Sequence, residues 1–419
     1  MRTLRLAWLL VVAACGAAPD PGVPPAEPGA APAAGLSRAA RFGLDRFLGA
    51  SAALGIHSGY VAIVARDGHA VHATTAGWAD REARRPMQLD THFRMASMTK
   101  PVTAVAAMIL VEEGRLGLDD PVSRTVPAAA ALRVATSAEA DASGRVPTEP
   151  LERPLRVRDL LTFQSGIGSE DDPSDLGRLW AARDLYTGSG SLALRVDRLL
   201  EAPLYEQPGT RWRYGWSADV LARVVEVAAG QPFGDFVRER ITEPLGMSAT
   251  RFFAEPDSRE GLATLYTQDE ARRLVPVAES RSDATDWTPG GSGLVSTAGD
   301  YLRFALMLWN GGAYGDARIL APETVAEMTR PHVASGVLAE EGIEGLGWGL
   351  GLAVVVDAGA SATPDRNGDF FWSGYYGTHF FVSPKTGLVM VILTQNLPSE
   401  HSRRPYPVYL APALAFWGL

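Results

Sequence analysis

The stretch that decides the fold is Ser97-Met98-Thr99-Lys100, which stands directly before the run from Pro101 to Glu113. This run is apolar on every side and ends at Gly114, which predicts a helix buried in the middle of a domain. Ser97 and Lys100 are three residues apart, a spacing that places both side chains on one helix face. There the amine is close enough to take the hydroxyl proton, and the helix N-terminus favours negative charge on the serine oxygen.

Lysine is rare in this chain, because only Lys100 and Lys385 occur among its 39 basic residues. Lysine can lose its proton when it is desolvated, whereas arginine cannot. The alternative for Lys100 is a side chain that extends to solvent from a helix end. The scarcity of lysine, the apolar helix and the lack of a Gly-x-Ser-x-Gly nucleophile signature favour a reactive pair.

Composition excludes several classes of function. The chain has 419 residues, 46% of them hydrophobic and 21% charged, as in an ordinary globular protein with one large domain or two smaller ones. Its net charge of −9 argues against binding of nucleic acid. A single cysteine excludes a disulfide framework, and the seven histidines contain no HExxH motif. We therefore expect neither a metal site nor a cofactor.

The N-terminus has the features of an export signal. Residues 1–14 carry two arginines followed by an apolar run that is too short to span a bilayer as a helix. The segment Val12-Ala13-Ala14-Cys15 resembles the bacterial lipobox, in which the cysteine is lipidated; the alternative is a plain signal peptide with an incidental Cys15. Residues 15–35 are a tether rich in Pro and Ala. These features predict an exported protein of the cell envelope, lipid-anchored in the membrane and facing the periplasm.

The remaining pattern predicts an α/β (α+β) fold with an antiparallel sheet flanked by helices. A first helix is expected at Leu36 to Leu48, and strands that flank a turn at Arg66-Asp67-Gly68 follow it. Residues 118–290 favour helices, including one capped by Ser217, and a mobile polar loop at 134–150. The last third returns to strands and closes with a helix near 406–417. We predict an α/β domain formed by 36–117 and 291–419, split by a mainly helical insertion at 118–290.

Several motifs resemble those of one superfamily in the expected order. Ser97-Met98-Thr99-Lys100 before an apolar helix resembles the first motif of the serine penicillin-binding proteins and class C β-lactamases. Further matches cover nearly the whole chain from about residue 36: Pro208 to Tyr214, Glu243 to Met247, Gly290 to Thr297, and Gly377-Thr378. The resemblance implies a β-lactamase/transpeptidase-like fold.

The second motif is represented by Tyr214. By the resemblance, this phenol lies beside Lys100 and shuttles the proton between Ser97 and the leaving group. The alternative is a tyrosine that packs before a helix. Lactamases of the family usually have Asn two residues later, where this chain has Trp216. That change removes an amide that would bind a lactam side chain, and we expect Trp216 to contact the substrate instead.

The third motif has two candidates. Lys385-Thr386-Gly387 matches the lactamase triad literally, but it lies between two strand-like segments and follows Pro384, so we interpret it as a hairpin turn. Trp372-Ser373-Gly374 resembles the corresponding motif of esterases related to class C β-lactamases, often called family VIII. The resemblance then implies an oxyanion hole from the N–H groups of Ser97 and Tyr375. The alternative for Trp372 is a core aromatic residue.

Three functions remain open. The first is a serine hydrolase that forms an acyl-enzyme and acts on short-chain or small neutral esters, because a tryptophan in the third motif cannot bind a substrate carboxylate as a lysine would. The second is a β-lactamase or D-amino-acid peptidase (DD-carboxypeptidase) of the same fold. The third is a lipid-anchored protein that binds a cell-wall peptide without turning it over. The complete set of Ser97, Lys100 and Tyr214 favours the first.

Overall fold

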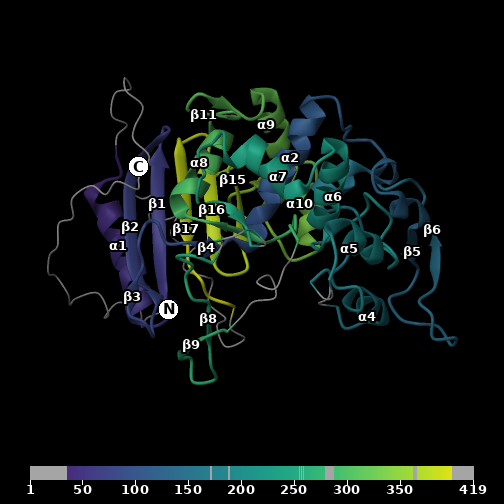
Figure 1. Ribbon diagram of the computed structural model, residues 1–419, viewed down its shortest axis with the longest axis horizontal. Coiled ribbons are helices and arrows are strands. Elements are labelled where there is room, and N and C mark those ends of the chain that lie inside the picture. The colour runs from purple at the N-terminus through teal and green to yellow at the C-terminus, as the bar shows by residue number, and fades with distance from the viewer. Residues whose placement is uncertain are drawn as a thin grey trace.

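The largest sheet of the described residues has eight antiparallel strands in the order β13-β14-β15-β16-β17-β1-β2-β3 (Figure 1). The computed structural model describes residues 35–169, 172–186, 189–253, 255, 257, 259–278, 287–361 and 366–398. The strands of the sheet are β1 Gly59–Arg66, β2 His69–Asp80, β3 Arg85–Pro86, β13 Leu346–Trp348, β14 Ala353–Val355, β15 Phe370–Gly374, β16 Thr378–Ser383 and β17 Leu388–Leu393.

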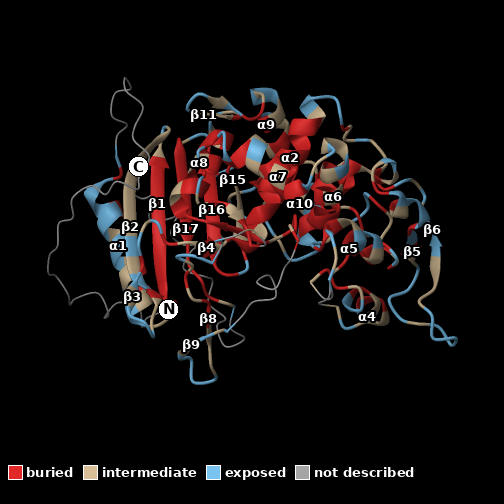
Figure 2. Ribbon diagram, in the orientation of Figure 1, coloured by how far each residue is buried: buried red, intermediate tan, exposed pale blue. Residues whose placement is uncertain are grey.

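The sheet joins the two ends of the described chain. β17 pairs with β1, and Val61 of β1 lies opposite Leu393 of β17. The last described strand therefore joins the same sheet as the hairpin near the start of the described chain. β16 and β17 are buried along their whole length, as is β1 except at Arg66, because helices cover both faces of the sheet (Figure 2). Helix α1, Arg38–Ala53, lies on one face, and helix α8, Ala298–Trp309, contacts β1, β16 and β17 on the other. The predicted antiparallel sheet with flanking helices is confirmed.

The helix that begins with the Ser97 motif is buried as predicted. Helix α2, Thr99–Glu112, is buried continuously through Leu110. It packs against α6, Ser217–Ala229, and against α7, Phe233–Val237. A helix that touches protein on every side has no polar face, which explains why its sequence lacks amphipathic periodicity.

The remaining elements are short. The other helical segments are η1 Ala96–Met98, η2 Val122–Arg124, η3 Pro127–Ala131, α3 Val157–Leu161, α4 Asp175–Ala181, α5 Leu192–Leu199, η4 Arg238–Thr242, α9 Pro322–Thr329 and α10 Ser335–Ala339. The other strands are β4 Phe93–Arg94, β5 Arg133–Ala135, β6 Thr148–Pro150, β7 Arg251–Phe252, β8 Tyr266–Gln268, β9 Leu274–Pro276, β10 Leu294–Ser296, β11 Ala313–Tyr314 and β12 Ala317–Arg318. Strands β4, β10 and β7 form a small sheet next to the start of α2. Among the described helices, none is long and apolar enough to cross a membrane.

One local prediction is wrong, and another holds only in part. Ser217 is the first residue of α6, and Trp216 occupies the cap position, because the Ser217 hydroxyl bonds with Ser165 Oγ at 2.7 Å instead of capping the helix. The predicted polar loop at 134–150 is irregular over residues 136–147, whereas its two ends lie in strands β5 and β6, which pair as a hairpin. The predicted closing helix lies outside the described residues. The boundaries 36–117, 118–290 and 291–419 stay predictions, although the eight-stranded sheet draws its strands only from the first and last of these segments.

Candidate active site

Ser97 lies where the chain turns from β4 into α2. The residue before it, Ala96, has a φ of 47°, a left-handed conformation that costs free energy in a residue with a Cβ. This turn places Ser97 in η1, directly before the first residue of α2. Tyr301 fixes the turn from the core, because its hydroxyl donates to the carbonyl of Met98 at 2.8 Å.

The structure brings Ser97, Lys100 and Tyr214 together. Lys100 Nζ lies 3.1 Å from Ser97 Oγ, and the Tyr214 hydroxyl lies 2.7 Å from the same oxygen. Lys100 Nζ also lies 4.8 Å from the centre of the Tyr214 ring. Lys100 is buried, whereas the Tyr214 side chain is 38% exposed. The nucleophile therefore has one buried and one solvent-facing group within proton-transfer distance.

The sequence reasoning missed Asp219, a carboxyl buried behind the lysine. Lys100 Nζ donates to the carbonyl of Gly291 at 2.7 Å, and the N–H of Gly291 donates to Asp219 Oδ1 at 2.9 Å. Burial raises the pKa of Asp219 to about 6, against the opposing effect of the Lys100 charge. Asp219 belongs to the first turn of α6. Carboxylates are common there because they interact favourably with the helix dipole, so the sequence alone gave no reason to place Asp219 in the site.

The loop that carries this contact requires glycine. A Cβ on Gly291 would lie 2.4 Å from Asp219 Oδ2, and a Cβ on Gly290 would lie 2.4 Å from the carbonyl oxygen of Ala218. Both distances are shorter than real contacts, so any larger residue would push the loop away from α6. The Gly290-Gly291 pair thus allows the backbone to reach both Asp219 and Lys100.

Aromatic rings surround the phenol of Tyr214. Phe163 stacks on it with ring centres 5.4 Å apart, and Trp212 lies at 6.1 Å. Trp372 lies at 5.6 Å and is supported at right angles by Trp348 at 4.5 Å. The phenol is therefore packed among aromatic rings, of which Phe163 and Trp212 are buried and Trp372 is half-buried.

The Trp372-Ser373-Gly374 motif forms the end of β15 beside Ser97. A Cβ on Gly374 would lie 2.2 Å from the carbonyl oxygen of Met95, so β15 touches the segment that leads into the nucleophile. Tyr375 follows the last paired residue of β15, and its side chain is 61% exposed. The Ser373 hydroxyl bonds across the sheet with His379 Nδ1 at 2.8 Å.

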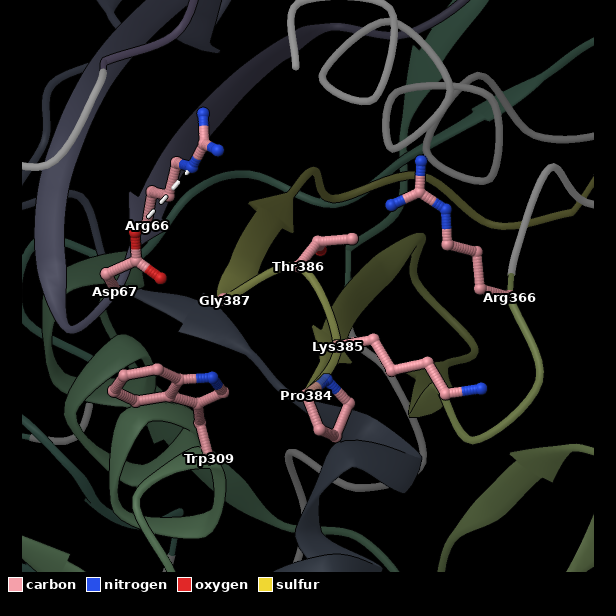
Figure 3. Close-up of a pocket in the computed structure, with 8 residues that line it drawn as sticks. All are labelled: Arg66, Asp67, Trp309, Arg366, Pro384, Lys385, Thr386 and Gly387. Carbon is pink, nitrogen blue, oxygen red and sulfur yellow. Dashed lines mark ion pairs between the residues drawn. The ribbon is translucent and has the colours of Figure 1, made fainter.

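Lys385 lies in the turn between β16 and β17, as predicted. This turn borders a cavity of about 490 Å³ together with Arg66, Asp67, Trp309 and Arg366 (Figure 3). It follows the C-terminal end of β16, whereas Thr378 at the opposite end of that strand bonds the Met95 carbonyl beside Ser97. Lys385 is therefore remote from the candidate site.

The expected substrate contact of Trp216 is wrong. Its side chain is 6% exposed and packs in the main core, with its ring centre 6.2 Å from that of Trp180. The reason is its position directly before α6, whose first six residues are all buried. Phe371, the residue before Trp372, points away from Trp372 because successive strand residues face opposite sides of the sheet, and its ring centre lies 5.6 Å from that of His379.

No group of three or more His, Cys, Asp or Glu side chains that could hold a metal ion occurs within the described ranges. Cys15, the predicted lipidation site, lies outside them.

Comparison with known proteins decides the family. The family model described as Beta-lactamase matches residues 44–415. The chain belongs to the β-lactamase family. It is 36% identical over 377 residues to Esterase EstB of Burkholderia gladioli, covering 85% of this chain and 90% of EstB. A Mycobacterium tuberculosis protein is 36% identical over 356 residues, covering 82% of this chain and 87% of that protein.

A solved structure also supports the fold of this β-lactamase family member. It is that of EstCE1, a hydrolase with promiscuous acyltransferase activity; the TM-score is 0.74 at 31% identity, covering 90% of this chain and 98% of EstCE1. The predicted β-lactamase/transpeptidase-like fold is confirmed, as is the prediction of a serine hydrolase related to esterases.

Proposed function

We propose that this β-lactamase family member is a serine esterase that acts through an acyl-enzyme on Ser97. One observation carries the proposal: Ser97 Oγ lies within hydrogen-bond distance of both Lys100 Nζ and the Tyr214 hydroxyl. A serine is a weak nucleophile by itself and needs an adjacent group that takes its proton. This site supplies two such groups, and both are held by surrounding structure.

In the first half-reaction, Ser97 Oγ attacks the ester carbonyl and its proton passes to the Lys100–Tyr214 pair. The oxyanion that forms is bound by the backbone N–H groups of Ser97 and Tyr375, which lie on the two segments that meet at Met95 and Gly374. Tyr214 is the exposed member of the pair, so it returns the proton to the leaving alkoxide. The ester C–O bond breaks, and the acyl group remains on Ser97.

In the second half-reaction, water replaces the alcohol. The Tyr214–Lys100 pair takes a proton from the water, and hydroxide adds to the acyl carbon. The tetrahedral intermediate then expels Ser97 Oγ, which regains a proton, and the carboxylic acid leaves. The carboxylate of Asp219 stabilises the ammonium form of Lys100 in both halves through their shared contact with Gly291.

The substrate class follows from the walls of the site. Trp372 stands at the position where the lactamase motif has a lysine, and it is half-buried beside the catalytic phenol. An apolar wall does not compensate the desolvation of a carboxylate, whereas it costs little for a short acyl chain. We therefore propose small neutral esters as substrates, in line with the esterase relatives.

The test compares p-nitrophenyl butyrate with the monoanionic p-nitrophenyl ester of succinic acid, with Ser97→Ala as the control. The proposal predicts turnover that requires Ser97 and a preference for the butyrate. Preference for the anionic ester, or turnover of a cephalosporin ring or a D-alanyl peptide in place of esters, would support the β-lactamase or peptidase alternative. Tight binding of a cell-wall peptide with no turnover of any of these would support the binding protein.

We also propose that Cys15 carries a lipid anchor and that the protein belongs to the cell envelope. The support is the match of Val12 to Cys15 to a lipobox and the Pro/Ala-rich tether that follows. Replacing Cys15 by Ala should move the full-length protein from the membrane fraction to the soluble envelope fraction. Unchanged membrane association of the Cys15→Ala protein would contradict the anchor.

A further inference from the structure

We propose that His379 is a positioning residue for the candidate active site. Through Ser373 and the backbone of Trp372, it holds the end of β15 so that the Tyr375 N–H stays in place for the oxyanion. This inference rests on the proposed esterase function. His379 lies on β16, one strand away from the nucleophile, and the chemistry described above does not use it.

His379 contacts two residues of the third motif. Ser373 and His379 are direct partners in the antiparallel pairing of β15 with β16, and their side chains bond at 2.8 Å. The imidazole also hydrogen-bonds the backbone of Trp372. One ring therefore holds two consecutive residues of the strand that ends at Gly374.

The ring is neutral and fixed in place. His379 is 3% exposed, and this burial lowers its pKa to about 3. Phe371, two residues before Ser373 on β15, contacts the ring from the same face of the sheet. A neutral imidazole has one donor and one acceptor nitrogen, so it can bond two polar groups without introducing a buried charge.

The end of β15 is held from the opposite side by the segment before Ser97. The Thr378 hydroxyl donates to the Met95 carbonyl at 3.0 Å, and Gly374 abuts the same carbonyl. The strand end is thus fixed between this contact and the imidazole on the other face. A shift of β15 would move Tyr375, which follows Gly374 directly, relative to Ser97.

The bond between Ser373 and His379 also explains why the middle residue of the motif can be a serine that does not contact the substrate. Strand alternation places Trp372 toward Tyr214 and Ser373 toward His379. The Ser373 hydroxyl is therefore used within the sheet. Its contribution to catalysis is expected to be indirect, through the position of the backbone.

The test measures kcat for each active site in His379→Leu, His379→Asn and Ser373→Ala. The number of active sites is determined by complete labelling with a fluorophosphonate. The rate is divided by this number, so that misfolded molecules do not lower the value of kcat. We expect kcat to fall about 10-fold in His379→Leu with KM within about twofold, because displaced oxyanion donors weaken the transition state more than the ground state. Asn can reproduce the Nδ1 contact, so His379→Asn should recover much of the loss.

Ser373→Ala is the milder test, because it removes one hydroxyl without changing the core. We expect a loss of about threefold, and little further loss when it is combined with His379→Leu, because both act through one contact. The matched control is His57→Leu. His57 is another buried histidine, 4% exposed, whose Nδ1 bonds the Tyr60 hydroxyl at 2.6 Å away from the motif.

An unchanged kcat per active site in His379→Leu and Ser373→Ala would overturn the inference. An equal loss in His57→Leu would also overturn it, because it would show a general effect of buried histidines on the sheet. Failure of the proposed function gives a different result: the wild-type protein would then show no ester turnover that depends on Ser97.

Discussion

Lys100 and Asp219 are linked through the backbone of a single residue, Gly291. The lysine donates to the Gly291 carbonyl at 2.7 Å, and the Asp219 carboxyl accepts from the Gly291 N–H at 2.9 Å. Peptide groups polarise one another along such a chain, so the carboxylate affects the ammonium without touching it. Asp219 is therefore the residue whose removal should show how the lysine is prepared for proton transfer.

Asp219→Asn should reduce kcat/KM about 10-fold and remove the acidic limb of the pH profile. Because the pKa of Asp219 is raised to about 6, the wild-type carboxylate forms as the pH rises through that value, and activity should rise with it. The measurement is kcat/KM for a neutral ester from about pH 4 to about pH 8. An identical acidic limb in Asp219→Asn would assign that limb to another group.

The same substitution should change the pH dependence of stability. Between the ordinary carboxyl value of 3.8 and about 6, folded Asp219 keeps a proton that the unfolded chain has lost. The folded state therefore binds more protons, and this residue's contribution to the free energy of unfolding falls as the pH rises through the window and is constant above it. Urea unfolding should show Asp219→Asn gaining stability relative to wild type across this window. A difference that does not vary with pH would contradict the assigned pKa.

Tyr214→Phe should reduce kcat about 10²- to 10⁴-fold with little change in KM. The substitution removes the hydroxyl that lies 2.7 Å from Ser97 Oγ and keeps the ring that stacks on Phe163. Tyr205→Phe is the matched control, because Tyr205 packs on Trp180 away from the nucleophile. Steady-state kinetics of both variants distinguishes loss of a proton carrier from loss of packing, since the latter would affect both.

The two lysines should behave in opposite ways. Lys100→Ala removes the buried amine beside Ser97 and should abolish measurable ester turnover. Lys385→Ala changes only the β16–β17 turn and should leave kcat/KM within about twofold. A large loss in Lys385→Ala would mean that the Lys385-Thr386-Gly387 turn has a role in substrate binding that its position does not explain.

Gly374→Ala should impair catalysis although it adds a single methyl group. That methyl group would lie 2.2 Å from the Met95 carbonyl oxygen and 2.2 Å from Thr378 Oγ1, so β15 must move away from the nucleophile. We expect kcat to fall about 100-fold, as when an oxyanion donor is lost. Gly49→Ala is the control, because Gly49 lies within α1 with no atom near its added Cβ. That variant should retain activity and be slightly more stable.

The reactive pair and the order of elements could be predicted from local sequence. The apolar run after Lys100 predicted the buried helix, and the spacing of Ser97 and Lys100 predicted the nucleophile. The position of Lys385-Thr386-Gly387 after Pro384 and between two strand-like segments identified it as a hairpin turn. These features depend on neighbours in the chain, which a single sequence displays.

Asp219, Trp216 and His379 depend on contacts between segments far apart in the chain. Asp219 resembles any acidic residue in a first helical turn until Gly291 is placed beside it. Trp216 resembles a pocket residue until Trp180 covers it. The bond of His379 with Ser373 depends on strand register, which the hydrophobic pattern here does not specify, because β16 is buried at every position.

The most direct test of the account is identification of the acylated residue. The protein is mixed with p-nitrophenyl butyrate, quenched with acid during turnover, digested and analysed by mass spectrometry. We expect one butyryl group on the peptide that contains Ser97, assigned to Ser97 by fragmentation and absent from Ser97→Ala. Sustained turnover with no butyryl group on Ser97, or with the group on another residue, would contradict it.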